Sequence, residues 1–472
     1  MDAPPPSSRT GSSDRASSRL ELAVLLHLGL FLLLLSWGFG GNAPWSRQAA
    51  CAWGTVGGVI TLAALRDSEM RQRARRWLWP LALLNLIVFV SLFNPTMREM
   101  SLDGEVLYAK TGGQAGWPGT AQPDASRSAL WLFDGILLSC FNLLLVVRQR
   151  RNLRRLLLFA GGNALVLAVF GTVQKFVKAK GLYFGLVPSP QTYFFSSFIY
   201  HNHWGAFTVL MVALCLGLVA HYARRSERDF WHSPAPSGLV AVFFLAVSIP
   251  LSTSRSCTLL VLFLLGGAFV HWIVRTLRHR RGHGGSFAGP LLLGTVAMFV
   301  AGGIAFKLAQ PVIEQRLAKT EEQVAEMRAQ GGLGQRAVLY RDTWHMAQDR
   351  LAFGWGMASY PRVFYLYNTQ RPGIDRLPFF YFDAHSDWLQ SVAELGLIGT
   401  LLLGLQGLVP LLSLAGHRPG LLACYLWAGC GLVLLYAWVE FPFGNPAVVF
   451  AWWLCFFAGL RYTRLEGRSA ES

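Results

Sequence analysis

The stretch AHSDWLQSVAELGLIG, residues 384–399, decides the fold, because a polar segment there runs directly into an apolar one. The apolar residues continue to about residue 414, and a helix of about 20 such residues crosses a bilayer. His385 and Asp387 therefore lie where a long polar loop enters a membrane span. A free imidazole has a pKa of about 6.5, so a histidine at this boundary can exchange a proton near neutral pH.

The composition extends the membrane assignment to the whole chain. Of its 472 residues, 53% are hydrophobic and 14% are charged, whereas soluble domains carry about 25% charged residues. All seven cysteines lie in or at the edge of apolar segments, and no metal-ligand spacing occurs. Neither a disulfide framework nor a metal site is therefore predicted.

Twelve apolar segments are candidate membrane spans. The first follows a polar, basic N-terminus and has no small-residue cleavage site, so we expect it to be retained as a helix. Only residues 252–256 separate the seventh segment from the eighth, but the charge pattern favours two helices over one re-entrant feature. The predicted spans are 22–40, 49–65, 77–93, 129–147, 156–173, 203–220, 238–252, 257–274, 287–306, 396–414, 420–438 and 446–460.

Lysine and arginine residues predict the orientation, because cytoplasmic loops carry an excess of both. With the N-terminus inside, the inner segments hold 24 of the 42 basic residues, the short outer loops hold 8, and 10 lie in one long loop. Both termini are thus expected in the cytoplasm. The net charge of +17 is then a topology signal whose partners are anionic membrane lipids, and nucleic acid is not an expected partner.

The predicted orientation divides the chain into five parts. Residues 1–21 are expected to be a disordered cytoplasmic tail, and residues 461–472 a second one. Residues 22–306 hold spans one to nine, and residues 396–460 hold the last three. Residues 307–395 form a large periplasmic loop that is expected to carry the site. Because the cytoplasmic loops are short and lack a GxxxxGK[ST] sequence, any chemistry is predicted on the outer side, without a nucleotide.

The long loop itself contains two predicted helices. Residues 312–329 have apolar positions near helical spacing, and a second helix is expected over residues 336–347. Residues 353–356 (FGWG) predict a turn. Residues 360–383 are aromatic and irregular, which suits either sugar rings or the membrane interface.

Several of these segments resemble one family. The residues from Gln335 to Gly356 resemble the outer-loop motif of the O-antigen ligase and polymerase family, and so does the stretch at 384–399, where the family usually has His-Asn in place of His385-Ser386. Three shorter segments also resemble the family, namely SSFIYHNHWGAF (196–207), TSRSCTLLVL (253–262) and VEFPFGNP (439–446). The resemblance covers roughly residues 190–450.

This resemblance implies an all-α polytopic membrane protein of the glycosyltransferase C type. It implies a polyprenyl-diphosphate-linked glycan as donor and an acceptor glycolipid or glycan with a free hydroxyl. The reaction is expected outside the bacterial inner membrane, without metal or cofactor.

Three arginines are candidate ligands of the donor diphosphate, because a planar guanidinium binds phosphate oxygens bidentately. Arg255 lies at a bilayer edge, where it either binds the phosphate or extends to the interface like other lysines and arginines. The resemblance favours Arg336 and places Arg341 second, while for each a solvated surface side chain is an equal alternative.

His385 is the candidate catalytic residue, either as general base on the acceptor hydroxyl or as a ligand that positions the diphosphate. An ordinary interface histidine is the alternative. Asp387 is a supporting candidate that orients His385 only if the backbone is not helical there. Asn202 and Glu394 are further supporting candidates, the second as a structural partner near the membrane edge.

Three other functions stay open at this point. A protein O-oligosaccharyltransferase shares the motifs of ligases and polymerases. A small-anion transporter of the same superfamily binds its substrate near the midplane, whereas the polar residues here gather at the outer face. A scaffold protein in an envelope complex predicts that Arg255 and His385 are dispensable.

Overall fold

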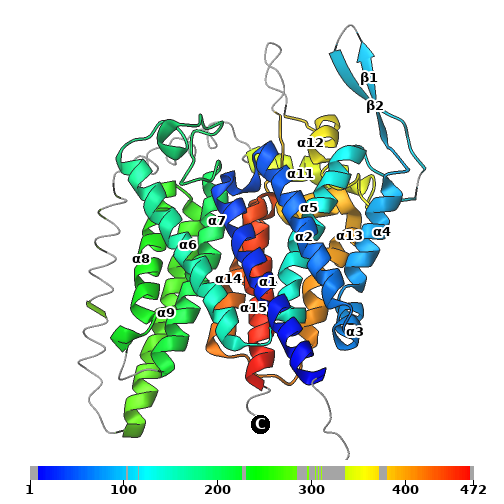
Figure 1. Ribbon diagram of the computed structural model, residues 1–472. Coiled ribbons are helices and arrows are strands. Elements are labelled where there is room, and N and C mark those ends of the chain that lie inside the picture. The colour runs from blue at the N-terminus through cyan, green and yellow to red at the C-terminus, as the bar shows by residue number, and fades with distance from the viewer. Residues whose placement is uncertain are drawn as a thin grey trace, which may run out of the picture.

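The structure is a computed structural model that describes residues 9–102, 105–114, 116–225, 230–283, 335–370 and 380–467, with a few isolated positions between 295 and 310. Figure 1 shows a bundle of long helices with small elements at one end. The predicted helix over residues 312–329 lies outside the described residues, and the predicted span 287–306 lies almost wholly outside them.

Apolar helices dominate the described chain and confirm an all-α polytopic membrane protein. Eight described helices are long and apolar enough to cross a bilayer, and a pair bent by 59°, α3 (Ser68–Trp77) and α4 (Trp79–Ser91), makes up to nine. The eight are α1 (Arg9–Trp37), α5 (Pro123–Val146), α6 (Arg150–Phe176), α7 (His201–Arg225), α8 (Ala235–Ser252), α9 (Arg255–His283), α13 (Asp387–Leu412) and α15 (Pro446–Gly467). Two shorter or less apolar helices, α2 (Pro44–Ala64) and α14 (Leu421–Tyr436), coincide with two more predicted spans.

The helix α15 lies at the centre of the bundle and α9 at its edge. The most apolar stretch of α15 is 94% buried by the protein, whereas that of α9 is 17% buried. Figure 1 shows α15, in red, between α1 and α14. A lipid-facing helix such as α9 keeps its apolar side chains outside because the bilayer solvates them.

The turn between α8 and α9 confirms two separate helices. The helix α8 ends at Ser252, and α9 begins at Arg255. Thr253 adopts the left-handed conformation with φ of 73°, which reverses the chain within two residues. Arg255 is thereby placed at the first position of α9.

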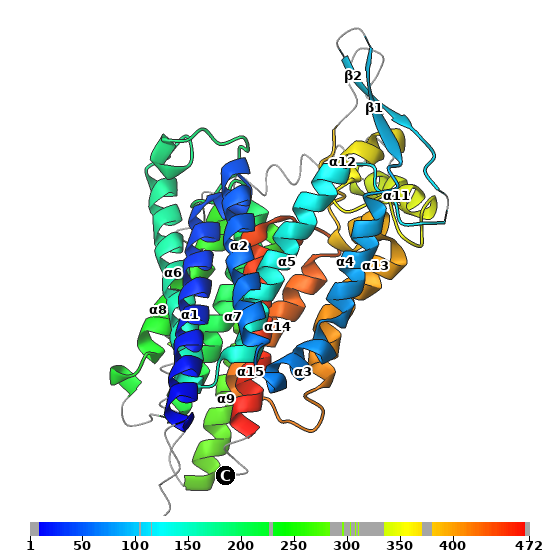
Figure 2. The ribbon, with the colours of Figure 1, turned by 45° about the vertical axis from the view of Figure 1, so that its right-hand side comes forward.

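The small elements gather at the end of the bundle opposite the described chain ends. Figures 1 and 2 both show α1 beginning and α15 ending at the lower face, while the antiparallel hairpin β1 (Met97–Leu102) and β2 (Glu105–Lys110) projects from the upper one. The helices α11 (Gln335–Gln348) and α12 (Tyr360–Val363) lie beside it, with short 3₁₀ turns η1 (Phe39–Gly41), η2 (Tyr183–Gly185), η4 (Phe364–Leu366) and η5 (Pro442–Gly444) in the connections. We call this end the site face. A further turn, η3 (Phe230–His232), precedes α8.

The expected helix over 336–347 is confirmed as α11, and the turn at 353–356 is confirmed by Gly354 and Gly356 at positive φ. The backbone of this segment hydrogen-bonds to α13 at the point where Gly396 interrupts that helix. Leu397 N donates to Leu351 O at 2.8 Å, and Trp355 N donates to Ala393 O at 3.0 Å. Gly396 has a φ of 66°, and a Cβ there would lie 2.3 Å from the Ala352 carbonyl, so the close approach requires glycine.

Three described helices extend beyond the predicted spans. The helix α1 begins at Arg9, within residues 1–21, and α15 continues to Gly467, within residues 461–472. The helix α13 begins at Asp387, so residues 387–395, at the end of the expected outer loop, are helical. Helices propagate cooperatively beyond the apolar stretch that crosses the membrane. The β1–β2 hairpin was not predicted at all.

Candidate active site

Glu440 is the centre of a polar cluster on the site face. Its carboxylate accepts hydrogen bonds from three segments that are far apart in sequence. His385 Nδ1 lies 2.7 Å from Oε1, Asn202 Nδ2 donates to Oε2 at 2.7 Å, and Arg336 Nη2 donates to Oε2 at 3.1 Å. The Glu440 side chain is 3% exposed, so these partners replace water around a buried charge.

The backbone of His385 turns its ring toward Glu440. His385 adopts a left-handed φ of 51°, which is uncommon for a residue other than glycine. Tyr340 donates from its hydroxyl to His385 O at 2.8 Å, and Gln390 Oε1 accepts from Ala384 N at 2.9 Å. The imidazole also packs edge-on against Phe441, with ring centroids 4.9 Å apart. These contacts fix the strained conformation.

The hydrogen bond to Glu440 determines the histidine tautomer. A carboxylate only accepts hydrogen bonds, so Nδ1 of His385 carries the proton and donates it to Glu440. Nε2 then carries a lone pair. The His385 side chain is 29% exposed, so the imidazole is accessible from the surface while its other nitrogen is held.

The charges in the cluster reinforce one another. Burial raises the pKa of the Glu440 carboxyl, but the hydrogen bond from His385 and the positive charge of Arg336 outweigh it, and the net pKa of Glu440 is lowered. At Arg336, burial lowers the pKa, but the charge of Glu440 outweighs burial and the net pKa is raised. Burial, together with Glu440, raises the pKa of the Tyr200 hydroxyl. At neutral pH, Glu440 and Arg336 are therefore charged and Tyr200 is neutral.

Asn202 joins the cluster to the turn that carries Arg255. The Asn202 amide donates to Tyr200 Oη at 2.8 Å as well as to Glu440. Its Oδ1 accepts from Ser254 Oγ at 2.7 Å. Arg255 follows Ser254 directly and is exposed, and within the described residues no ion pair or hydrogen bond occupies its guanidinium.

One family model matches part of this chain. Residues 239–404 match the family model described as O-antigen ligase. The match confirms the resemblance to the O-antigen ligase and polymerase family. It covers about a third of the 472 residues, from α8 into α13. No curated protein matches the chain.

The O-antigen ligase match includes His385, Arg255 and Arg336 but not Asn202 or Glu440. It supports glycan transfer of the O-antigen ligase type, with a lipid-linked glycan and an acceptor as partners in general. Together with the apolar helices, it indicates a multi-pass protein of the bacterial inner membrane.

The structure does not bring Arg341 into the Glu440 cluster. Arg341 Nε and Nη2 each lie 3.2 Å from Oδ1 of Asp342, the next residue in the chain. Nη2 also donates to Thr369 Oγ1 at 2.9 Å. The Asp342 side chain is fully buried, so Arg341 compensates a buried carboxylate on α11.

Asp387 and Glu394 accept hydrogen bonds from backbone amides of other segments. Asp387 Oδ2 accepts from Phe443 N at 2.8 Å, which ties the start of α13 to η5. Glu394 accepts from Ala358 N and Tyr360 N, each at 2.9 Å, and so holds the loop before α12. The carboxylate that hydrogen-bonds to the imidazole is thus Glu440 and not Asp387.

Glu440 is the site residue that the sequence did not single out. It lies within VEFPFGNP (439–446), a segment that resembles the O-antigen ligase family, yet no role follows from that segment alone. The available signal is a lone carboxylate between aromatic and apolar residues at the end of a span, which is costly without a partner. Among the described residues, no group of three or more histidine, cysteine or acidic side chains could hold a metal ion.

Proposed function

We propose that this protein transfers a glycan from a polyprenyl diphosphate donor to an acceptor hydroxyl, with His385 as general base. The hydrogen bond between His385 Nδ1 and Glu440 Oε1, at 2.7 Å, is the observation that carries the proposal. It leaves Nε2 able to accept a proton, which is the property that a general base needs. A buried carboxylate behind a partly exposed imidazole has the same logic as the acid and histidine of hydrolytic triads.

The proposed reaction is a single displacement. Nε2 of His385 takes the proton of the acceptor hydroxyl while the hydroxyl oxygen bonds to the anomeric carbon of the donor glycan. The bond from that carbon to the diphosphate oxygen breaks, and its electron pair leaves with the polyprenyl diphosphate. The charge of Glu440 stabilises the imidazolium that forms, because the two groups already share a hydrogen bond.

Arg336 is proposed to bind the leaving diphosphate. It donates from Nη1 to Val439 O at 2.9 Å and from Nη2 to Glu440. A guanidinium has five N–H donors, so several remain for phosphate oxygens. The side chain is 52% exposed and therefore accessible to a ligand.

Arg255 is proposed as a second phosphate ligand. It begins α9, and the N-terminal end of a helix favours negative charge. Its guanidinium has no acidic partner among the described residues that a phosphate would have to displace. Arg341 is the weaker candidate, since Asp342 and Thr369 already occupy it.

The position of the cluster favours the transferase over a small-anion transporter. Transporters bind their substrate near the midplane of the bilayer. Here the four linked residues His385, Glu440, Arg336 and Asn202 lie in or beside connections at one end of the bundle. Ligation to a glycolipid, polymerisation of repeat units and transfer to a protein hydroxyl share this chemistry.

Complementation tests the proposal. His385→Ala, Arg255→Ala and Arg336→Ala are expressed separately in a null strain, with protein levels compared by immunoblot. We expect loss of the surface polysaccharide with each variant at normal protein level. A glycan ladder retained on the lipid carrier indicates a ligase, and single repeat units indicate a polymerase. Normal polymer with all three variants excludes the catalytic role.

A further inference from the structure

An apolar groove lies between the helices α9 and α14. Its volume is about 560 Å³, within the range of about 300–1,000 Å³ that ligand pockets occupy. Residues of α9 between Phe263 and His271 form one wall, and residues of α14 between Leu421 and Leu435 form the other. Most of the lining side chains are apolar, so the groove suits a hydrocarbon and not a glycan. Because α9 faces lipid, such a hydrocarbon can enter from the bilayer.

Two glycines face the empty space of this groove. Gly267 on α9 and Gly431 on α14 both line it, and a Cβ on either would have no non-neighbouring atom of the described residues within 4 Å. Closely packed helices leave few spaces larger than a water molecule. The missing side chains therefore keep a channel open between the two helices, and a larger side chain at either position would occupy it.

One hydrogen bond joins the two walls. His271 Nδ1 lies 2.9 Å from the Tyr425 hydroxyl oxygen, and the ring centroids are 5.8 Å apart. The contact pairs two polar groups that would otherwise face an apolar ligand at a cost in free energy. It also fixes the separation of α9 and α14 at this level.

The two walls lead to the two proposed ligands of the donor diphosphate. Arg255 begins α9, and α14 ends at Tyr436, four residues before Glu440, which binds Arg336. Arg255 and Arg336 therefore stand at the site-face ends of the two walls. A diphosphate bound between them would have its apolar chain directly over the space between α9 and α14.

The depth of the groove limits which chain can fill it from the site face. Phe263 follows Arg255 by 8 residues and His271 by 16, so they lie about 12 Å and about 24 Å along α9. An acyl chain of an outer-leaflet lipid reaches about half of the bilayer core, or about 15 Å. A lipid anchored at the level of Arg255 therefore needs a longer chain, such as a polyprenyl chain, to occupy the groove.

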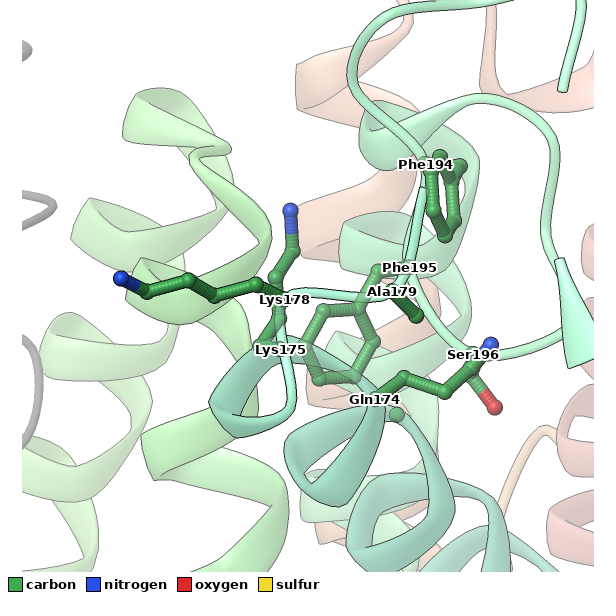
Figure 3. A pocket seen from close by; sticks show the side chains of 8 residues that line it. Gln174, Lys175, Lys178, Ala179, Phe194, Phe195 and Ser196 are labelled. Atoms are coloured by element: carbon green, nitrogen blue, oxygen red, sulfur yellow. The ribbon is translucent and has the colours of Figure 1, made fainter. Parts of the chain in front are cut away.

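A second hollow, at the end of α6, is a poorer match for a long apolar chain. Its volume is about 260 Å³, and none of its lining residues belongs to α9 or α14. Figure 3 shows that Gln174, Lys175 and Lys178 come from this end of α6, so polar side chains make up part of its surroundings.

We propose that the groove between α9 and α14 binds the polyprenyl chain of the lipid-linked donor. The inference rests on the proposed glycan transfer and assigns the part of the donor that does not react. Because lipid tails are as apolar as this chain, the groove selects it by length and fit and not by hydrophobicity. Binding of the chain then holds the diphosphate at the site face.

The test measures binding of polyprenyl diphosphates without a glycan to the purified full-length chain, by native mass spectrometry. Undecaprenyl diphosphate is the long probe, and geranyl diphosphate has the same head group on a short chain. Wild type should bind the long probe more tightly. Gly267→Leu and Gly431→Leu should each weaken undecaprenyl diphosphate binding roughly tenfold, because extra methylene groups do not fit an apolar site that the ligand fills. Both variants should bind geranyl diphosphate like wild type.

Gly266→Leu is the matched control. Gly266 also has open space around a Cβ, but it points about 100° away from Gly267 around α9 and does not line the groove. Leucine forms helix better than glycine, so all three variants should fold. Gly266→Leu should bind both probes like wild type.

Four results would overturn the proposal. They are equal affinity of wild type for the two probes, wild-type binding of undecaprenyl diphosphate by Gly267→Leu and Gly431→Leu, an equal loss with Gly266→Leu, and displacement of the long probe by an equal concentration of phosphatidylglycerol. The last result would assign the groove to membrane phospholipid.

Binding needs no transfer, so this test separates the groove from the proposed reaction. The expected binding pattern in a protein that transfers no glycan would contradict the proposed function and keep the groove. Glycan transfer by a protein that binds both probes equally would contradict the groove alone.

Discussion

His385 Nδ1 and Glu440 Oε1 lie 2.7 Å apart although 55 residues separate them in the chain. The two residues flank the pair of helices α13 and α14, and the left-handed turn at His385 directs the imidazole across to the carboxylate. One contact thereby sets the tautomer of the imidazole, compensates a buried charge and joins α13 to the connection before α15.

The first prediction concerns Glu440→Gln. The amide has the shape of the carboxylate but no charge, so it stabilises neither the Nδ1–H tautomer nor the imidazolium. Loss of the hydrogen-bond partner that orients a metal-binding histidine costs roughly 10- to 100-fold in activity, and we take the same factor for His385. We expect kcat to fall by that factor with a smaller change in KM for the acceptor, measured by transfer assays on the purified protein.

Glu69→Gln is the matched control for this substitution. Glu69 lies at the exposed start of α3, and among the described residues its carboxylate pairs with Arg73. Its variant should retain wild-type kcat. Equal kcat values for Glu440→Gln and wild type would show that the carboxylate has no part in proton transfer.

The second prediction separates the two loop arginines. Arg336→Lys keeps the charge but loses the planar fork that reaches Val439 O and Glu440 together. We expect it to raise KM for the lipid diphosphate donor, with Arg336→Ala raising it further. Arg341→Lys, next to Asp342, should leave this KM unchanged. A larger effect of Arg341→Lys than of Arg336→Lys would exchange their proposed roles.

The third prediction assigns Glu394 to the scaffold. Two backbone amides, those of Ala358 and Tyr360, donate to its carboxylate, and Glu394 is 8% exposed. An unsatisfied buried donor costs about 1–3 kcal/mol. Glu394→Gln should therefore lower the midpoint of thermal unfolding while the folded fraction keeps its rate per molecule. Unchanged stability with lost activity would contradict this assignment and give Glu394 a role in catalysis.

The fourth prediction is a pH dependence of stability. The pKa of Glu440 is lower in the folded chain than in the unfolded one, because His385 and Arg336 outweigh burial. The unfolded chain then binds more protons between the two pKa values, so this contribution to the free energy of unfolding is complete above the ordinary glutamate pKa of about 4.3 and is lost as the pH falls through the lowered value. The difference in unfolding midpoint between wild type and Glu440→Gln should shrink in acid. A difference that grows as the pH falls contradicts the assigned sign.

The membrane helices and α11 were predictable because their signals are local. A run of about 20 apolar residues has few alternatives to a span, and the spacing in residues 336–347 needs no distant partner. The β1–β2 hairpin was not predictable in this way, since its six paired positions alternate weakly between apolar and polar residues.

The site was predictable only in part. His385 and Arg336 stand out because polar residues are rare at span ends and because their segments resemble a family. Their common partner Glu440 depends on a contact across 55 residues and on one left-handed backbone angle. Sequence proximity favoured Asp387 instead, and only the direction of the chain at His385 excludes it.

Single-turnover transfer by the full-length protein in nanodiscs tests the central claim most directly. A polyprenyl-diphosphate-linked glycan and an acceptor glycolipid are supplied, and donor binding is measured alongside product. His385→Ala should bind the donor but form product about 10²- to 10⁴-fold more slowly, since that is the usual contribution of a general base. His345→Ala, an exposed histidine on α11, should match wild type. Product formation by His385→Ala at the wild-type rate would contradict the account.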